Sequence, residues 1–110
     1  NENDELISID YLDKIKLRVA KVLSAERVDG SEKLLKLQVS LGNETRQIVS
    51  GIAKYYDPST LIGKKVIVVT NLAPIKIRGV ESFGMVLCAA NNDDLELIEI
   101  KELPSGSIVR

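Results

Sequence analysis

Residues 35–50 read LKLQVSLGNETRQIVS, and this stretch contains the pattern that decides the fold. From residue 35 to residue 41 every second side chain is leucine or valine, and the side chains between them are polar. This alternation predicts a strand with one buried face. Gly42 and Asn43 then predict a hairpin turn into a second strand over residues 44–50.

Further strands are predicted on both sides of this hairpin. An alternation that begins at Lys16 is followed by a turn at Asp29 and Gly30, and the run KVIVVT is rich in β-branched residues, which is typical of a strand covered on both faces. The additional strands are expected at residues 16–25, 65–70, 85–90 and 95–100.

Only two short helices are predicted. Ser8 is placed to cap a helix over residues 9–15. Asp57 is followed by proline and, at residue 63, by glycine, which is the pattern of a short capped helix. We expect residues 1–7 to be a solvated tail and residues 8–110 to form one domain.

Three strands, a short helix and at least two further strands form the layout of an OB-fold. The predicted fold class is therefore all-β, an OB-fold five-stranded barrel with short helices and a C-terminal β extension. An SH3-like barrel or a small sandwich would give similar spacing, so the residues alone leave these alternatives open.

The overall charge hides two basic stretches. The 110 residues carry 15 Lys and Arg against 16 Asp and Glu, a net charge of -1, which excludes a globally basic nucleic-acid-binding protein. Residues 14–37, however, contain seven basic and three acidic residues, and residues 64–80 contain four basic residues and no acidic one. A local basic surface is therefore expected on a nearly neutral domain.

The composition also limits the chemistry. The chain has no histidine and one cysteine, which excludes histidine-based catalysis, a disulfide framework and ordinary zinc sites. We therefore expect a domain without catalytic residues, metal or cofactor. No apolar run approaches the roughly 18 to 20 residues that span a bilayer, and no signal-peptide pattern opens the chain. The expected location is the cytoplasm, with no membrane partner.

The most informative stretch runs from residue 70 to residue 88. Lys76 and Arg78 alternate with isoleucines, so an extended segment would turn both cations to one side. With Asn71 and Ser82, this stretch can bond phosphate and ribose oxygens without reading base identity. The alternative is that both cations protect a sheet edge from pairing, and the residues alone slightly favour it.

The few aromatic residues limit the kind of nucleic acid that could bind. They are Tyr11, Tyr55, Tyr56 and Phe83, and no two alternate on a strand. Because single-strand binders stack successive bases on aromatic side chains, a folded RNA read by its shape is the better expectation. Cys88 is predicted to be a buried small hydrophobe.

Residues 71–85 follow the pattern N-L-x-P-x-K-x-R-G-x-x-S-x-G-M. This pattern resembles the signature of the tRNA-binding domain found at the C-terminus of many methionyl-tRNA synthetases and in free-standing dimeric tRNA-binding proteins. Residues 17–22 and 49–56, which read LRVAKV and VSGIAKYY, agree with the same family.

The resemblance implies a homodimeric OB-fold that binds tRNA by shape at the outer corner of the L, and a parent chain that is a methionine-tRNA ligase. By position, the tRNA-binding residues would be Asn71, Lys76, Arg78, Ser82 and Met85, with Lys33 and Lys54 as additional candidates. The cations would neutralise phosphates, the two polar side chains would bond the RNA backbone, and Met85 would pack against the RNA.

The chain departs from the family pattern at a few positions. Val28 and Asp29 replace a frequent His-Pro pair, Ala73 replaces a frequent lysine, and Phe83 stands where glutamine is common and can add a stacking surface. Two rival functions remain: a free-standing tRNA-binding protein, and a peptide-binding chaperone of the same fold. The chaperone would need an exposed apolar groove, and relatives of that kind lack the 71–85 pattern.

Overall fold

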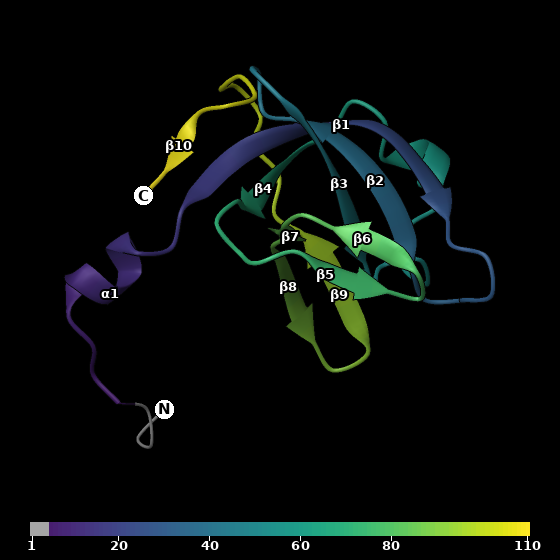
Figure 1. The fold of residues 1–110 in the computed structure, drawn as a ribbon, viewed down its shortest axis with the longest axis horizontal. Coiled ribbons are helices and arrows are strands. Elements are labelled where there is room, and N and C mark those ends of the chain that lie inside the picture. The colour runs from purple at the N-terminus through teal and green to yellow at the C-terminus, as the bar shows by residue number, and fades with distance from the viewer. Residues whose placement is uncertain (1–4) are drawn as a thin grey trace.

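The computed structural model describes residues 5–110, and Figure 1 shows its fold. Residues 1–4, the greater part of the predicted tail, lie outside the described residues. Residues 5–7 are exposed and have no regular secondary structure. The elements in chain order are α1 (Ile9–Asp13), β1 (Leu17–Arg27), β2 (Leu35–Ser40), β3 (Thr45–Ser50), the 3-10 helix η1 (Pro58–Thr60), β4 (Lys65–Val69), β5 (Ile75–Ile77), β6 (Val80–Ser82), β7 (Met85–Val86), β8 (Cys88–Asn91), β9 (Asp94–Leu97) and β10 (Ile108–Val109).

The main sheet has the strand order β3-β2-β1-β4-β7, and its pairings are antiparallel. The long strand β1 pairs with β4 through its first half and with β2 through its second half. A register shift between Val22 and Ser24 marks an irregularity, and such irregularities bend a strand and increase its twist. The result is one nearly closed, barrel-like sheet, so the all-β prediction is confirmed.

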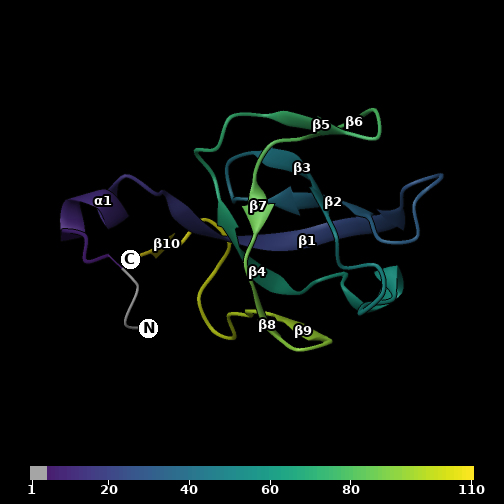
Figure 2. The same ribbon diagram turned by 90° about the horizontal axis from the view of Figure 1, so that it is seen from below.

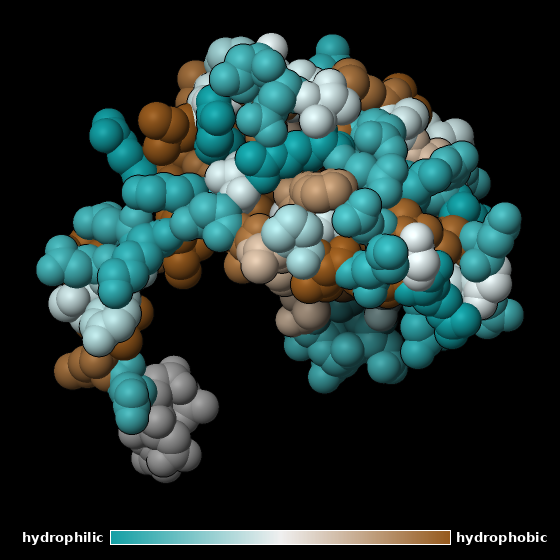
Figure 3. Space-filling model, viewed as in Figure 1, coloured by the Kyte–Doolittle hydropathy of each residue, from teal (hydrophilic) through white to brown (hydrophobic). Residues whose placement is uncertain are grey.

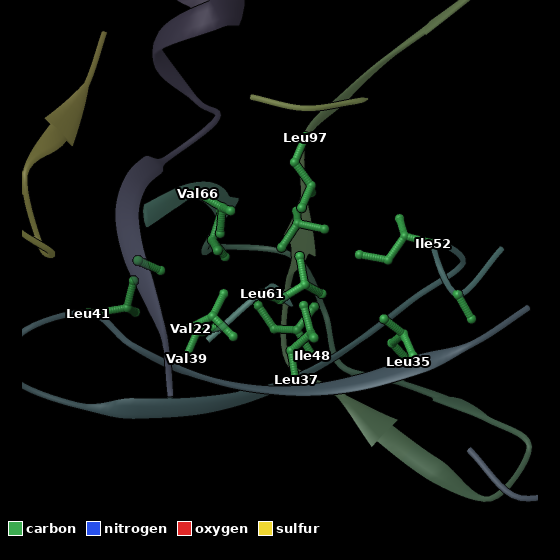
Figure 4. Packing of buried hydrophobic residues seen from close by; sticks show 14 residues of the cluster. Val22, Leu35, Leu37, Val39, Leu41, Ile48, Ile52, Leu61, Val66 and Leu97 are labelled. Atoms are coloured by element: carbon green, nitrogen blue, oxygen red, sulfur yellow. The ribbon is translucent and has the colours of Figure 1, made fainter. Parts of the chain in front are cut away.

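The core lies inside this curved sheet (Figure 4). The predicted alternation along β2 is confirmed, because Leu35, Leu37 and Val39 are buried while the residues between them are partly exposed. The expectation for β4 also holds, since all four residues after Lys65 are buried. Aliphatic side chains of β1 to β4 meet Leu61, which follows η1, and Leu97 of β9 at the centre of the core.

Both predicted helices are shorter than expected. The helix expected over residues 9–15 ends at Asp13, and Ser8 stands at its N-cap without a side-chain hydrogen bond. The second is a single 3-10 turn rather than an α-helix, although Asp57 caps it as predicted by accepting a hydrogen bond from the Ser59 N–H at 3.0 Å.

The C-terminal half differs from the prediction in its strand boundaries, and the strand expected over residues 95–100 is β9, which ends at Leu97. The strand expected over residues 85–90 is two strands, β7 and β8. Leu87 between them still donates a hydrogen bond to the Ile67 carbonyl of β4, and after it the chain leaves the main sheet. β8 pairs instead with β9 in a separate hairpin. The predicted C-terminal extension is present as β10, which pairs with the start of β1.

The N-terminal helix stands away from the barrel in both views (Figures 1 and 2). None of the residues of α1 is buried. Together with β10 it forms an arm at one end of the molecule, whereas the β5–β6 turn and the β1–β2 loop lie at the opposite end.

Candidate nucleic-acid interface

The 71–85 stretch contains a hairpin that the sequence analysis described only as a loop. β5 and β6 pair antiparallel, and Arg78 and Gly79 form the two-residue turn between them. Their φ angles are 51° and 79°, and two successive positive φ values define the type I′ turn that suits twisted hairpins. Arg78 therefore belongs to the turn and not to an extended strand, which corrects the expected alternation with Lys76.

The two faces of the hairpin differ in character. Ile75 is opposite Ser82 and Ile77 is opposite Val80, so these four side chains share one face. Lys76 is opposite Glu81 on the other face, where both are exposed. The cation of β5 thus points away from the apolar face.

Ser82 attaches this hairpin to the barrel. It is the one buried polar side chain found among residues 5–110, with an exposed fraction of 2%. Its hydroxyl accepts a hydrogen bond from the Val49 N–H at 2.9 Å and donates one to the Gly84 carbonyl at 3.1 Å. The family resemblance implies that this hydroxyl bonds RNA, whereas in the structure it accepts a hydrogen bond from an amide on the edge strand β3.

Gln47 and Arg46 of β3 add further bonds to the same segment. The Gln47 side-chain amide donates to the Glu81 carbonyl at 2.8 Å, and the Gln47 backbone carbonyl accepts from the Phe83 N–H at 2.9 Å. Arg46 Nη1 donates to the carbonyls of Thr70 and Phe83, at 2.6 and 3.2 Å. Arg46 thereby holds both ends of the segment that carries the hairpin.

Asn71 also bonds within the chain. Its Oδ1 accepts from the Lys16 N–H at 2.9 Å, and its Nδ2 donates to the Lys14 carbonyl at 2.7 Å. Asn71 therefore joins the start of the hairpin segment to the linker between α1 and β1. Sequence reasoning missed this role, and also those of Arg46 and Gln47, because contacts between distant segments leave no spacing pattern.

An apolar groove lies beside the inner face of the hairpin. Its volume is about 660 Å³, and its walls come from the end of β3, from β5, from β7 and from the β8–β9 hairpin. Met85 lines it and is 53% exposed, so this side chain is available to a ligand. Cys88, predicted to be buried, is half-buried in the wall, and burial raises the pKa of its thiol. Figure 3 shows hydrophobic surface over the β5 region within a largely hydrophilic face.

Lys33 and Lys54 lie close to one another. Both are exposed, and the Ala53 N–H donates to the Lys33 carbonyl at 3.0 Å, which joins the β1–β2 loop to the segment after β3. Figures 1 and 2 place this loop at the same end of the molecule as the β5–β6 turn. The structure thus gathers Lys33, Lys54 and the hairpin turn at the end opposite α1.

Within residues 5–110 there is no cluster of three or more His, Cys, Asp or Glu residues that could hold a metal ion. In the same part of the chain, no helix is long and apolar enough to cross a membrane.

A small β-barrel that presents cations on a hairpin and an exposed methionine on the strand that follows it has the form of a nucleic-acid-binding module. The comparison with protein families is specific: residues 17–107 match the model described as a putative tRNA binding domain. The chain belongs to this family of tRNA-binding domains.

Relatives among known proteins agree with this membership. The chain is 56% identical over 109 residues to the methionine–tRNA ligase of Clostridium tetani and 54% identical over 110 residues to that of Halalkalibacterium halodurans. These alignments cover 96% and 99% of this chain but 17% and 16% of the relatives. The chain thus corresponds to about a sixth of the length of these relatives.

Two solved structures share the fold over nearly all of the chain. The MetRS related protein from Pyrococcus horikoshii superposes with a TM-score of 0.93 at 43% identity, covering 97% of this chain and 100% of that one. The chaperone CsaA from Bacillus anthracis str. Ames has a TM-score of 0.88 at 26% identity, covering 96% and 100%. The fold is therefore shared by a MetRS related protein and by a chaperone.

Proposed function

We propose that this chain is an OB-fold tRNA-binding module of a methionine–tRNA ligase, attached C-terminally to the catalytic part of that enzyme. The family match and the relatives above support this proposal. The module itself uses no cofactor, and the parent enzyme would act in the cytoplasm. A free-standing tRNA-binding protein is the alternative for the same site.

The tRNA contacts are assigned to the exposed cations at the hairpin end and to Met85 on β7. Lys76, Arg78, Lys33 and Lys54 would neutralise phosphates, and Met85 would pack against the RNA. Arg78 supports this assignment because its positive φ is unfavourable for a bulky residue, and such strain is concentrated at functional positions. Because phosphate contacts carry no base information, this surface would recognise the shape of tRNA, at the outer corner of the L.

Ser82 and Asn71 would position the hairpin segment that carries the proposed tRNA contacts. Each uses its side-chain polar atoms in hydrogen bonds to backbone groups of distant segments. In the proposed site they hold the hairpin segment at its end and at its beginning. Either side chain could bond RNA through these polar atoms only after breaking its hydrogen bonds to the backbone.

The arm formed by α1 and β10 is the proposed homodimer surface. An apolar groove of about 1020 Å³ lies between α1, the start of β1 and β10. Its wall includes Leu12 and Ile108, and Ile108 is 73% exposed. Exposed apolar surface of this kind marks an interaction site, and a two-fold dimer would cover it. The cationic end would remain free, so a dimer would present two linked sites to RNA.

Binding of tRNA, single-stranded RNA and a short duplex to this chain across a salt series tests the proposal. We expect tRNA to bind most tightly. The Lys76→Ala/Arg78→Ala variant should lower the salt slope by about one to two units, roughly one for each lost phosphate contact. Lys21→Ala/Lys101→Ala is the matched control, since it removes the same charge elsewhere. Equal slopes for both variants would contradict the assigned site.

A peptide-binding chaperone is the second candidate, because the apolar groove beside β5 and the likeness to the CsaA structure both fit it. Titration with an unfolded apolar peptide separates the two functions. Tight peptide binding that an Ile75→Ser substitution abolishes, together with weak tRNA binding, would favour the chaperone.

A further inference from the structure

A second cavity, which shares only Leu72 with the lining of the apolar groove, lies where strands β2 and β3 meet the hairpin segment. Its volume is about 620 Å³. One side is apolar and consists of Leu72, Pro74 and Phe83, and the other side carries polar side chains of β2 and β3, among them Gln38 and Gln47. A planar ligand with an apolar face and a polar edge suits such a lining.

The aromatic ring in the apolar wall is held by its backbone. The Phe83 N–H donates to the Gln47 carbonyl, and the Phe83 carbonyl accepts from Arg46. The side chain itself remains 36% exposed, so part of the ring is available inside the cavity. Aromatic rings bind planar partners by stacking, and nucleobases are such partners.

The polar wall offers a donor and an acceptor side by side. Gln38 Nε2 donates to Gln47 Oε1 at 2.9 Å, and Gln47 Nε2 in turn donates to the Glu81 carbonyl. This chain of bonds fixes the orientation of the Gln38 amide. Its Oε1 and its second N–H have no hydrogen-bond partner among residues 5–110. An amide with one free donor and one free acceptor matches the edge of a nucleobase.

The charge of the cavity favours a base over a phosphate. Arg46 lines it, but its guanidinium pairs with Glu44 and bonds the Thr70 and Phe83 carbonyls. The cavity therefore presents little free positive charge, unlike the exposed lysines of the hairpin end. An uncharged ligand edge is the better match for it.

We propose that this cavity takes one unstacked nucleobase of the bound RNA, which stacks on Phe83 and forms hydrogen bonds with Gln38. The inference rests on the proposed tRNA-binding function and adds a base contact to the phosphate contacts. It also agrees with the face formed by strands 2 and 3 on which barrels of the OB type bind oligonucleotides. A single aromatic ring provides for a single base, in keeping with the few aromatic residues of the chain.

A ring series at position 83 tests the stacking contact by tRNA binding across a salt series. Phe83→Ala and Phe83→Leu should each weaken binding by about 5- to 100-fold at every salt concentration, with an unchanged slope, because stacking is not a phosphate contact. Phe83→Tyr, which keeps the ring, should stay within about twofold of the parent affinity. If Phe83→Leu binds as well as the parent, the ring is not used and the inference is overturned.

A second measurement separates a base contact from a shift of the hairpin. Amide NMR spectra of the whole chain are recorded with a nucleoside monophosphate and, as the control, with ribose 5-phosphate. The Gln38 side-chain signals should move only with the nucleotide. Equal changes with both ligands, or no change at Gln38, would overturn the inference.

The measurements distinguish loss of the base contact from absence of tRNA binding. If tRNA binds and the Lys76→Ala/Arg78→Ala variant lowers the slope while the ring series has no effect, only the base contact is rejected. If the parent chain does not prefer tRNA, the proposed function itself is rejected.

Discussion

The buried hydroxyl of Ser82 and the backbone N–H of Val49 are joined by a hydrogen bond of 2.9 Å. Val49 lies on the edge strand β3, whose backbone groups would otherwise be open to water or to another chain. The same hydroxyl donates to Gly84, where the chain passes from the hairpin into β7. One serine thus covers a sheet edge and fixes the base of the hairpin that carries the candidate RNA contacts.

Ser82→Ala should destabilise the chain by about 1 to 3 kcal/mol, because the buried Val49 N–H loses its partner. Urea unfolding measures this change, and hydrogen exchange of the Val49 amide locates it. Ser24→Ala, an exposed serine on β1, is the control and should change stability by about 0.5 kcal/mol or less. Equal effects of the two substitutions would contradict the proposed positioning role.

Arg46→Met should loosen the hairpin without removing a surface phosphate contact. The variant keeps the length of the side chain but loses the bonds to Thr70 and Phe83. We expect faster hydrogen exchange over residues 75–83 and weaker tRNA binding. Arg46→Lys keeps the charge and some of the donors, so it should restore part of both properties. An unchanged hydrogen-exchange rate in Arg46→Met would contradict the role of Arg46 in holding both ends of the hairpin segment.

Gly84→Ala should lower the free energy of unfolding by more than an ordinary glycine substitution. An added Cβ would lie 2.9 Å from the Val69 carbonyl oxygen, at a φ of +149°. We expect a loss of about 2 to 4 kcal/mol, since strain and a clash with backbone act together. Gly30→Ala is the control, with a φ of +81° and open space around the position. It should cost about 1 kcal/mol, the effect of the backbone conformation alone. Similar losses in thermal or urea unfolding would show that the close approach at Gly84 is unimportant.

Leu12→Lys/Ile108→Lys should convert the proposed dimer into monomers, because both charges enter the apolar groove of the arm. Sedimentation velocity measures the oligomeric state. The tRNA affinity of the monomer should fall through loss of avidity, while the salt slope per protomer remains. Leu103→Lys places a charge at another exposed leucine and should leave the dimer intact. A parent chain that sediments as a monomer would contradict the proposed surface.

The Asp57 cap should make stability depend on acid pH. The backbone N–H of Ser59 and then its hydroxyl hold the pKa of this carboxyl below its usual value of 3.8. A lowered pKa stabilises the folded state above the unfolded pKa, and this contribution is lost as the pH falls below about 4. The stability difference between the parent and Asp57→Asn should therefore shrink on acidification. Ser59→Ala keeps the backbone donor, so it should retain part of the pH dependence. A difference that stays constant from neutral to acid pH would contradict this account.

Local patterns in the sequence determined much of the barrel. The alternation over residues 35–41 decided which face of β2 is buried, because successive side chains of a strand point to opposite sides. Glycine with asparagine at residues 42 and 43 determined the turn, and the β-branched run determined that β4 is buried. The 71–85 pattern, through its resemblance, determined the family, which the comparison confirms.

Only the tertiary structure decided the roles of residues in the candidate site. Asn71 lies 55 positions from Lys16 and Ser82 lies 33 positions from Val49, yet hydrogen bonds join each pair. The cavity beside Phe83 likewise requires β2 and β3 to meet the 71–83 segment. Spacing along the chain reports the periodicity of single elements, and it carries no information on which distant segments will satisfy one another's polar groups. The sequence therefore determined the candidates for RNA contact, and the packing of the hairpin segment against distant strands decided which of these side chains form hydrogen bonds within the chain.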